Sequence, residues 1–575
     1  MSLVDNPLNH PAAHQAPERD VEKGGELNDK DADVNISSFA SSNSEENTTH
    51  TSNSSLGAHD VAPTPVILRG RLKRWNDKIE SLAGLEARGI TRVLEEEKHG
   101  ISLMGYAQMC ILWFSINVTV NNLAVGFLGP LAFNLGWVDS VLLTVFGCAL
   151  GSVGTSYTST WGAESGNRTL IVARYIMGYW PAKLIAILNA ILMVGYGVIS
   201  CIIAGQMLSA VNGGHMTIIV GIIISALIIG VVAIFGMAVL HVYERYMDTS
   251  IPKPHIRPPV IINLIPSIRW AFVPQVIALF VLIGAAGPHF NTALQSSAPI
   301  TGTAGEITAN RLSFFALQYS VPVGWAAAGS DFYVYYPTHT NKKLTFLMTW
   351  LGLTSSFIFV NVIGVGLGCG VAIIPAWQTA YATSSGALIF ASYGGLGGFG
   401  GFCTVILALS AIQNNIPGTY AAAIDLQILG RYFKAVPRWL WVVVVVVVEL
   451  VCGVAGRDHL FDIFENFLAL MGYWISIFVT IMLEEHVLFR ILRRVPFDWT
   501  AWEDRKRLPL GVAALTAFLI GWAGAIIGMY QAWYAGPIAT HVGGYGADIG
   551  TWVAVAFTCV TFPPMRWLEL RLVGR

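Results

Sequence analysis

The chain carries little charge. Asp, Glu, Lys and Arg make up 12% of its 575 residues, and the formal net charge is −1. A soluble globular protein has about 25% charged residues, so most of this chain is not expected to face water. The near-zero net charge gives no reason to expect a nucleic-acid partner.

Motifs for metal binding and catalysis are also lacking. The seven cysteines fall within or beside apolar runs, and none has a CxxC or Cys/His spacing. We interpret them as inert buried thiols and expect neither a disulfide framework nor a metal site. The sequence contains no GxxxxGK[ST], GxSxG or HExxH motif. We therefore expect no enzymatic activity and no bound cofactor.

Residues 1–85 are predicted to form a disordered tail, followed by a juxtamembrane lead-in over 86–103. The first 60 residues are rich in Ser, Asn, Asp and Glu and contain no apolar stretch. Such a segment buries too little apolar surface to offset the entropy lost on folding. It also lacks the apolar core of a secretory signal peptide.

Long apolar stretches fill residues 104–566, and each is near the ~20 residues that a helix needs to cross a bilayer. The fold class predicted is an all-α polytopic membrane protein in which every backbone group is satisfied within a helix. The lipid bilayer is then an expected partner. Twelve spans are predicted to start near residues 104, 138, 174, 216, 268, 312, 344, 400, 438, 463, 509 and 547.

Lys and Arg are distributed asymmetrically about these spans. Eleven precede the first span, whereas the predicted loops on the opposite side hold only Arg311 and Arg457. Because cytoplasmic loops are enriched in Lys and Arg, both termini are predicted to be cytoplasmic, the C-terminal end being residues 567–575. No loop is long enough for a nucleotide-hydrolysing domain, so any transport is predicted to be passive or driven by a gradient.

Polar residues interrupt the first and sixth predicted spans. The first contains Ser115, Asn117, Thr119 and paired asparagines at 121–122, and the sixth contains Pro322 and Gly324. Paired interruptions in corresponding halves are typical of transporters that bind substrate at broken helices. Kinked packing helices with interhelical hydrogen bonds are the alternative interpretation.

The eighth and third predicted spans carry further polar groups. Asn414, Asn415 and Pro417 lie in the eighth, and an amide offers donors and acceptors to the edge of a heterocycle. Tyr196 and Ser200 lie one helical turn apart in the third. Either set also suits simple helix packing. Four carboxyl groups are candidates for carrying a proton: Asp331, Asp425, Glu449 and Glu465.

Several stretches resemble the fungal purine-cytosine permeases of the nucleobase–cation symporter-1 family. They run in order from residue 86 to the C-terminus. The clearest are EARGITRV (86–93), the first span from Trp113 to Pro130, SDFYVYYP (330–337), NNIP (414–417), GRDHLF (456–461), ENFLALMGYW (465–474) and LEEHVLFR (483–490).

The resemblance implies a LeuT-like fold, in which a five-plus-five inverted repeat is followed by two C-terminal helices. It also implies proton-coupled import of nucleobases such as cytosine, adenine or hypoxanthine across the plasma membrane. Trp325, Asn414, Asn415 and Pro417 match the family's substrate-site positions, and so does Ser115. A sodium site in this fold needs hydroxyl groups ahead of the eighth-span amides, where only Ser410 offers one, so a proton is favoured.

The third span departs from the family pattern. Tyr196 and Ser200 stand where the family usually has Trp and Asn. We expect a planar ring to stack between Trp325 and Tyr196, with the amides of Asn414 and Asn415 reading its polar edge. The departure leaves other substrates open, such as a vitamin B6 form, and so does a receptor that binds without transporting. The sequence does not specify an oligomeric state.

Overall fold

The computed structural model describes residues 89–98, 100–247, 272–290 and 303–575. All of these residues belong to one compact unit, Asp60–Arg575. The tail predicted to be disordered, 1–85, lies outside the described residues, as does the start of the predicted lead-in.

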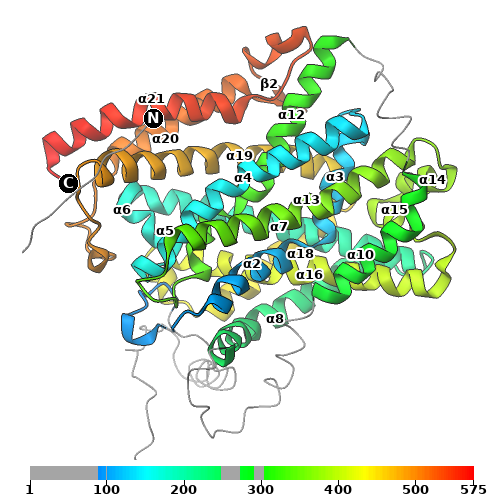
Figure 1. The fold of residues 1–575 in the computed structure, drawn as a ribbon, viewed down its shortest axis with the longest axis horizontal. Coiled ribbons are helices and arrows are strands. Elements are labelled where there is room, and N and C mark those ends of the chain that lie inside the picture. The colour runs from blue at the N-terminus through cyan, green and yellow to red at the C-terminus, as the bar shows by residue number, and fades with distance from the viewer. Residues whose placement is uncertain (1–88, 99, 248–271, 291–302) are drawn as a thin grey trace, which may run out of the picture. The chain divides into compact units, whose positions relative to one another are not determined.

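The described residues are mostly helical, and a long helix begins within four residues of ten of the twelve predicted span starts (Figure 1). The other two starts were wrong by about two turns, since the helix predicted from 174 begins at Pro181 and the helix predicted from 312 begins at Ala304. The long helices are α2 (Leu103–Asn117), α3 (Val120–Leu131), α4 (Trp137–Ser165), α7 (Pro181–Val211), α8 (Ile218–Met247), α10 (Phe272–Ala286), α12 (Ala304–Val323), α13 (Lys342–Val371), α16 (Gly397–Ile428), α18 (Arg438–Gly456), α19 (Leu460–Glu484), α20 (Val512–Gly528) and α21 (Gly550–Val573).

Shorter elements lie between the long helices, and the apolar runs did not predict them. They are η1 (Glu95–Glu97), α5 (Thr169–Val172), α6 (Arg174–Met177), η3 (Gly287–His289), η4 (Gly324–Ala327), η5 (Gly329–Phe332), α14 (Pro375–Thr383), α15 (Ser385–Ala391), η6 (Gly394–Leu396), α17 (Arg431–Lys434), the π-helix η7 (Glu485–Ile491), η8 (Trp499–Ala501), β1 (Tyr530–Gln531), β2 (Tyr534–Ala535) and η9 (Ala539–Gly544). The two strands pair antiparallel in a small hairpin.

Seven described helices are long and apolar enough to cross a membrane, and α2 with α3 makes an eighth if the bent pair is one span. Two shorter apolar helices, Ile218–Ile234 and α20, add to these. α12 and α21 are not among the candidates, because polar and charged residues lower their mean hydropathy. The chain is therefore an all-α polytopic membrane protein, and twelve spans stay a prediction.

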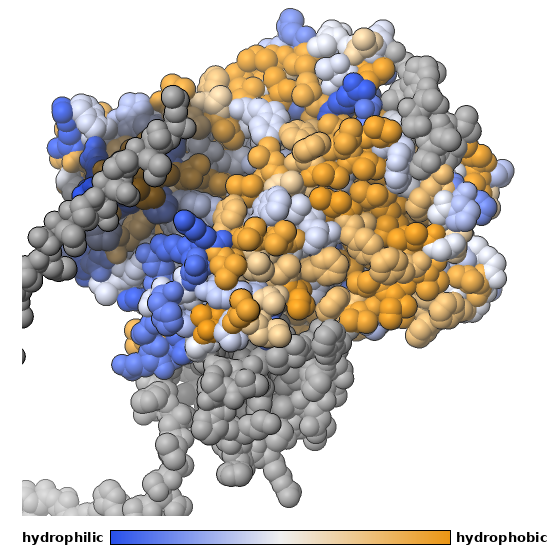
Figure 2. Space-filling view, in the orientation of Figure 1, coloured by the Kyte–Doolittle hydropathy of each residue, from blue (hydrophilic) through white to orange (hydrophobic). Residues whose placement is uncertain are grey.

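Apolar side chains on the outer surface fit this assignment. Figure 2 shows them over a broad area of the face drawn, with hydrophilic residues gathered toward one end. The valine run of α18 illustrates the pattern, because Val443, Val444 and Val447 are exposed whereas Val442 and Val445 are buried. Exposed apolar area of this extent is unfavourable in water and favourable in lipid.

The helices that carry the predicted site pack closely together. α16 lies along α7, α13 along α3 and α4, and α12 along α4. The last two long helices, α20 and α21, pack against each other and against α19 (Figure 1). Candidate site residues on α2, α7, α12 and α16 are thereby brought into one region.

Candidate functional site

The first span is broken at its polar run. α2 ends at Asn117, Val118 and Thr119 leave helical geometry, and α3 restarts at Val120 with an axis bent by 63° from that of α2. A break leaves backbone groups without intrahelical partners. Side chains of α16 supply them, because the Ser410 hydroxyl accepts from the Val120 N–H at 3.1 Å and the Asn414 amide nitrogen donates to the Ile116 carbonyl at 2.7 Å.

The sixth span loses its α-helical geometry beside this break. α12 ends at Val323, and tighter turns begin at Gly324. Pro322 has no N–H to donate to the Gln318 carbonyl, and the thiol of Cys148 donates to that carbonyl at 3.7 Å. The Pro322 carbonyl accepts from the Thr155 hydroxyl at 2.7 Å. Side chains of α4 therefore stabilise the interruption.

Six side chains meet at the two breaks, and we call them the central polar cluster. The indole N–H of Trp325 donates to Asn117 Oδ1 at 3.1 Å. The Asn121 amide nitrogen donates to Ser200 Oγ at 2.7 Å and to Asn414 Oδ1 at 3.5 Å. The cluster consists of Asn117 from α2, Asn121 from α3, Tyr196 and Ser200 from α7, Trp325 from η4 and Asn414 from α16.

Tyr196 reaches the cluster through the sixth-span break. Its hydroxyl lies so close to Gly324 that a Cβ atom there would be 3.0 Å from the hydroxyl oxygen. Its ring meets Phe467 edge-on, with 6.0 Å between ring centres, and the Trp325 ring meets Trp113 edge-on at 5.8 Å. These edge contacts fix both rings in orientation.

Two buried polar atoms of the cluster have no hydrogen-bond partner within the described part of the chain. They are the carbonyl oxygen of the Asn121 amide and the hydroxyl of Tyr196. Asn414 uses one N–H and one acceptor position, which leaves its amide a second of each. Because buried polar groups are normally paired, these atoms form an arrangement that suits a ligand with donor and acceptor atoms.

Not every predicted site residue joins this cluster. Asn415 points to a different helix from its neighbour Asn414, because its amide nitrogen donates to Thr419 Oγ1 at 3.1 Å and to Glu449 Oε1 at 3.3 Å. Successive residues of an α-helix differ by about 100° in direction, which explains the divergence. Ser115 donates to the Leu112 carbonyl of its own helix, and Pro417 is half-buried within α16.

The first two proton-carrying candidates, Asp331 and Asp425, have polar partners at their carboxyl groups. Asp331 lies 3.6 Å from the guanidinium of Arg168 and accepts from the Thr169 N–H at 2.8 Å. Asp425 accepts from the Asn189 amide at 2.6 Å. An ion pair and hydrogen bonds already account for the Asp331 carboxylate.

The third candidate, Glu449, is fully buried in α18 and accepts hydrogen bonds from Asn415 and Thr419. The side chain of the fourth, Glu465, lies outside the described residues. Sequence reasoning left Glu449 without a partner, and its contacts come from α16, 30 and 34 residues away in the chain. Asn121 also lay outside the predicted site, although its polar run pointed to the break.

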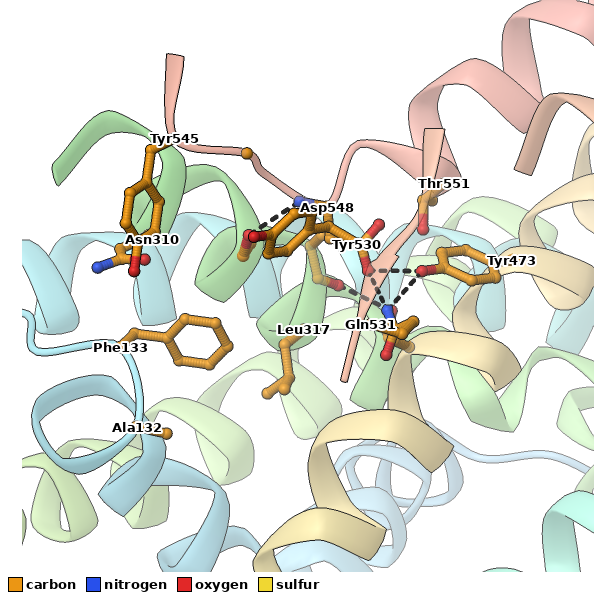
Figure 3. Close-up of a pocket in the computed structure, with 15 residues that line it drawn as sticks. Ala132, Phe133, Asn310, Leu317, Tyr473, Tyr530, Gln531, Tyr545, Asp548 and Thr551 are labelled. Atoms are coloured by element: carbon orange, nitrogen blue, oxygen red, sulfur yellow. Dashed lines mark hydrogen bonds between the residues drawn. The ribbon is translucent and has the colours of Figure 1, made fainter. Parts of the chain in front are cut away.

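A separate cavity of about 180 Å³ lies along the middle of α12, between that helix, α19, the hairpin and the start of α21 (Figure 3). Asp548 organises one wall. Its Oδ2 accepts from Tyr473 at 2.5 Å and Gln531 at 2.6 Å, and its backbone N–H donates to Ser313 at 2.9 Å. The lining extends along α12 to Ser320, two residues before Pro322, so the cavity leads toward the sixth-span break.

A family model described as permease for cytosine/purines, uracil, thiamine and allantoin matches residues 101–545. A vitamin B6 transporter of Saccharomyces cerevisiae is 30% identical over 575 residues, with 92% of this chain and 95% of that protein covered. The purine-cytosine permease fcyB of Emericella nidulans is 32% identical over 506 residues, with 87% and 92% covered.

Among solved structures, the chain is similar to Mhp1, a nucleobase-cation-symport-1 family transporter in a closed conformation with bromovinylhydantoin bound. The TM-score is 0.59 at 14% identity, with 85% of this chain and 96% of Mhp1 covered. The inward-facing conformation of Mhp1 matches with a TM-score of 0.58. This likeness identifies the fold as the LeuT-like fold that the sequence resemblance implied.

Proposed function

The chain belongs to the family of permeases for cytosine and purines, uracil, thiamine and allantoin, and we propose that it imports a small planar nitrogen heterocycle by proton symport across the plasma membrane. Membership makes the protein a membrane transporter rather than an enzyme. The specific substrate, the coupling ion and the orientation in the membrane are the proposed parts.

The observation that carries the proposal is the central polar cluster at two broken helices. Trp325 supplies an aromatic ring for stacking, and Asn414 supplies an amide edge with free donor and acceptor capacity. The unpaired atoms of Asn121 and Tyr196 add an acceptor and a hydroxyl group. A heterocycle with ring nitrogens and exocyclic polar groups can stack on the aromatic ring and also form hydrogen bonds with these polar atoms.

Nucleobases of the cytosine, adenine and hypoxanthine type are the first candidate substrates. A vitamin B6 form is the second, favoured by Tyr196 and Ser200 in the third span and by the longer match to the vitamin B6 transporter. A pyridine that carries hydroxyl groups pairs with hydroxyl-bearing side chains. A site built around hydrogen bonds discriminates strongly against ligands that leave its groups unpaired.

We propose a proton rather than sodium as the coupling ion. A sodium site in this fold needs hydroxyl groups ahead of the eighth-span amides, and Ser410 lies at that place. Its hydroxyl accepts from the Val120 N–H and donates to the Leu407 carbonyl at 2.6 Å, which leaves one acceptor position on the oxygen, and one such position is too few ligands to hold a sodium ion. The excess of Lys and Arg in predicted same-side loops supports cytoplasmic termini.

The deciding experiment is uptake of labelled cytosine, adenine, hypoxanthine and pyridoxine in yeast that lacks its own permeases. It is run at acidic and neutral pH, with and without a protonophore, and with surface protein quantified. We expect saturable uptake of one heterocycle class that the protonophore abolishes. Binding without uptake would instead indicate a receptor, and uptake that follows sodium would overturn proton coupling.

A further inference from the structure

Glu449 faces the protein interior from the edge of the bundle. It follows the valine run of α18. Val442, Val445 and Glu449 are spaced three and then four residues apart, so they lie on one face of the helix, and all three are buried. Its exposed fraction is 0%, whereas Val447 and Val448 beside it are exposed. The carboxyl group is therefore directed away from the surface that meets lipid.

The hydrogen bonds of Glu449 are uneven. Oε1 accepts from Asn415 Nδ2 at 3.3 Å and from Thr419 Oγ1 at 3.0 Å. Oε2 is buried without a hydrogen-bond partner in the described part of the chain. No Lys, Arg or His among the described residues forms an ion pair with it, so only neutral donors oppose its charge.

Glu449 also approaches α7 closely at the turn that carries Tyr196. A Cβ atom on Gly197 would lie 2.2 Å from Glu449 Oε1 and 2.8 Å from Asn415 Nδ2, so a side chain at 197 would displace one of them. Gly197 lies between Tyr196 and Ser200, both members of the central polar cluster. Helices α7, α16 and α18 therefore meet at this carboxyl group, next to the central polar cluster.

We propose that Glu449 is the group that takes up the coupled proton, and that Asn415 links it to the central polar cluster. This inference rests on the proposed symport, since it names the residue that performs it. Uptake converts the carboxylate to a carboxylic acid at Oε2, the oxygen without a partner, and release to the opposite side restores the carboxylate. No other reactant is needed.

The physical reason is the cost of moving a charge through an occluded state. A buried carboxylate without a cation is strongly unfavourable, whereas its neutral acid needs only hydrogen bonds. A substrate bound to Asn414 shifts the same turn of α16 that carries Asn415, whose N–H contacts Oε1. Substrate occupancy and proton binding then influence each other reciprocally, as linkage requires.

Other titratable groups near Glu449 are few in the described helices packed against α18. On α7, Cys201 packs against α18 beside Gly453, and Tyr196 lies next to Gly197. The apolar part of α8, Ile218–Ile234, contains no titratable residue. On α16, Asn415 and Thr419 make the contacts, and neither titrates. Glu449 is thus the carboxyl group at this three-helix contact.

The test uses the full chain reconstituted in liposomes, with labelled heterocycle and an imposed proton gradient. We expect Glu449→Gln to retain exchange of substrate across the membrane but to lose gradient-driven accumulation. In the wild type, substrate affinity should be roughly tenfold higher at acidic than at mildly alkaline pH, because in a symporter the bound proton favours substrate binding. In Glu449→Gln the affinity should not depend on pH over this range. The matched control, Glu484→Gln, replaces a half-buried carboxyl group at the end of α19 and should behave as wild type.

Infrared difference spectroscopy on the purified proteins separates failure of this inference from failure of the proposed function. A carboxylic-acid band that responds to pH in the wild type and disappears in Glu449→Gln would establish the proton site even if no heterocycle tested is transported. A band that Glu449→Gln retains, or accumulation by this variant that still requires the proton gradient, would overturn the assignment. If Glu484→Gln alone loses the carboxylic-acid band and the gradient-driven accumulation, the proton site is Glu484 and not Glu449.

Discussion

Two glutamates of this protein are equally buried and have opposite surroundings. Glu449 and Glu485 are both 0% exposed. Glu485 lies 2.8 Å from Arg566 and 3.1 Å from Arg490, whereas Glu449 contacts an amide and a hydroxyl group. Burial alone therefore does not assign a role to an intramembrane carboxyl group. The neighbours decide whether it forms an ion pair or meets only neutral donors.

Glu485 belongs to a cluster of ion pairs that holds neighbouring helices together. Arg566 comes from α21 and also lies 3.5 Å from Glu569, whose carboxylate accepts from the N–H groups of Gly511 and Ala513 at the start of α20. The cluster joins the π-helix η7 at the end of α19 to the last two long helices. Each of these charges has an opposite charge or a helix N-terminus beside it.

The same substitution at both glutamates gives the largest expected difference. Glu485→Gln should destabilise the protein by about 3–5 kcal/mol, because it leaves Arg566 buried without its main partner. Glu449→Gln should leave stability unchanged or slightly raised. The thermal unfolding midpoint of the detergent-solubilised protein measures both. Equal losses at the two sites would mean that Glu449 is also held by a structural network.

Asn414→Ala tests the amide of the central polar cluster. It removes the donor to the Ile116 carbonyl and the acceptor for Asn121, and it should weaken substrate binding by about 1–3 kcal/mol through lost and unpaired hydrogen bonds. Equilibrium binding of labelled substrate, corrected for the amount of folded protein, gives the value. Asn466→Ala, on α19, is the matched control, since that amide donates to a carbonyl of its own helix. If only surface abundance falls, Asn414 serves packing.

Trp325→Ala tests stacking. The substitution should reduce affinity by about 1–3 kcal/mol, the range found for stacking of a base on an aromatic side chain. Trp325→Phe should retain part of the affinity, because it keeps a ring but loses the donor to Asn117. The ratio of uptake KM values among the three proteins measures the effect. Unchanged KM in Trp325→Ala would place the ring of the substrate elsewhere.

Tyr196→Phe should have the smallest effect. The hydroxyl has no partner in the described part of the chain, so its removal should leave stability within about 1 kcal/mol of wild type. If the hydroxyl binds the substrate, affinity should fall by a similar amount while the unfolding temperature stays constant. Paired binding and melting measurements separate the two. A loss of stability without a loss of affinity would assign the Tyr196 hydroxyl to the folded structure rather than to the substrate.

The arrangement of long helices was predictable because each span must be apolar over its whole length. Ten of the twelve predicted starts lie within four residues of the start of a long helix, and the polar run after Ser115 lies where α2 ends and α3 begins. The short helices α14 and α15 were not predicted, because segments that connect spans carry no requirement for a continuous apolar run. The same holds for α5, α6 and the hairpin.

The candidate site was only partly predictable. The sequence indicated Trp325 and Asn414 as polar or aromatic groups at interrupted spans, and both lie in the central polar cluster. It treated Asn414 and Asn415 as one unit, although they face α2 and α18 respectively. Hydrogen bonds between residues distant in the chain, such as the one from Asn121 to Ser200, leave no local pattern.

The sequence by itself determined the membrane class, the breaks and the resemblance, since hydropathy, proline and polar runs act within a single helix. The tertiary structure decided which polar groups are paired. Glu449 and Glu485 are both glutamates in apolar surroundings, and their difference appears only when α16 brings neutral donors to one and α21 brings an arginine to the other. Electrostatic energy depends on distance through space, and helix packing sets that distance.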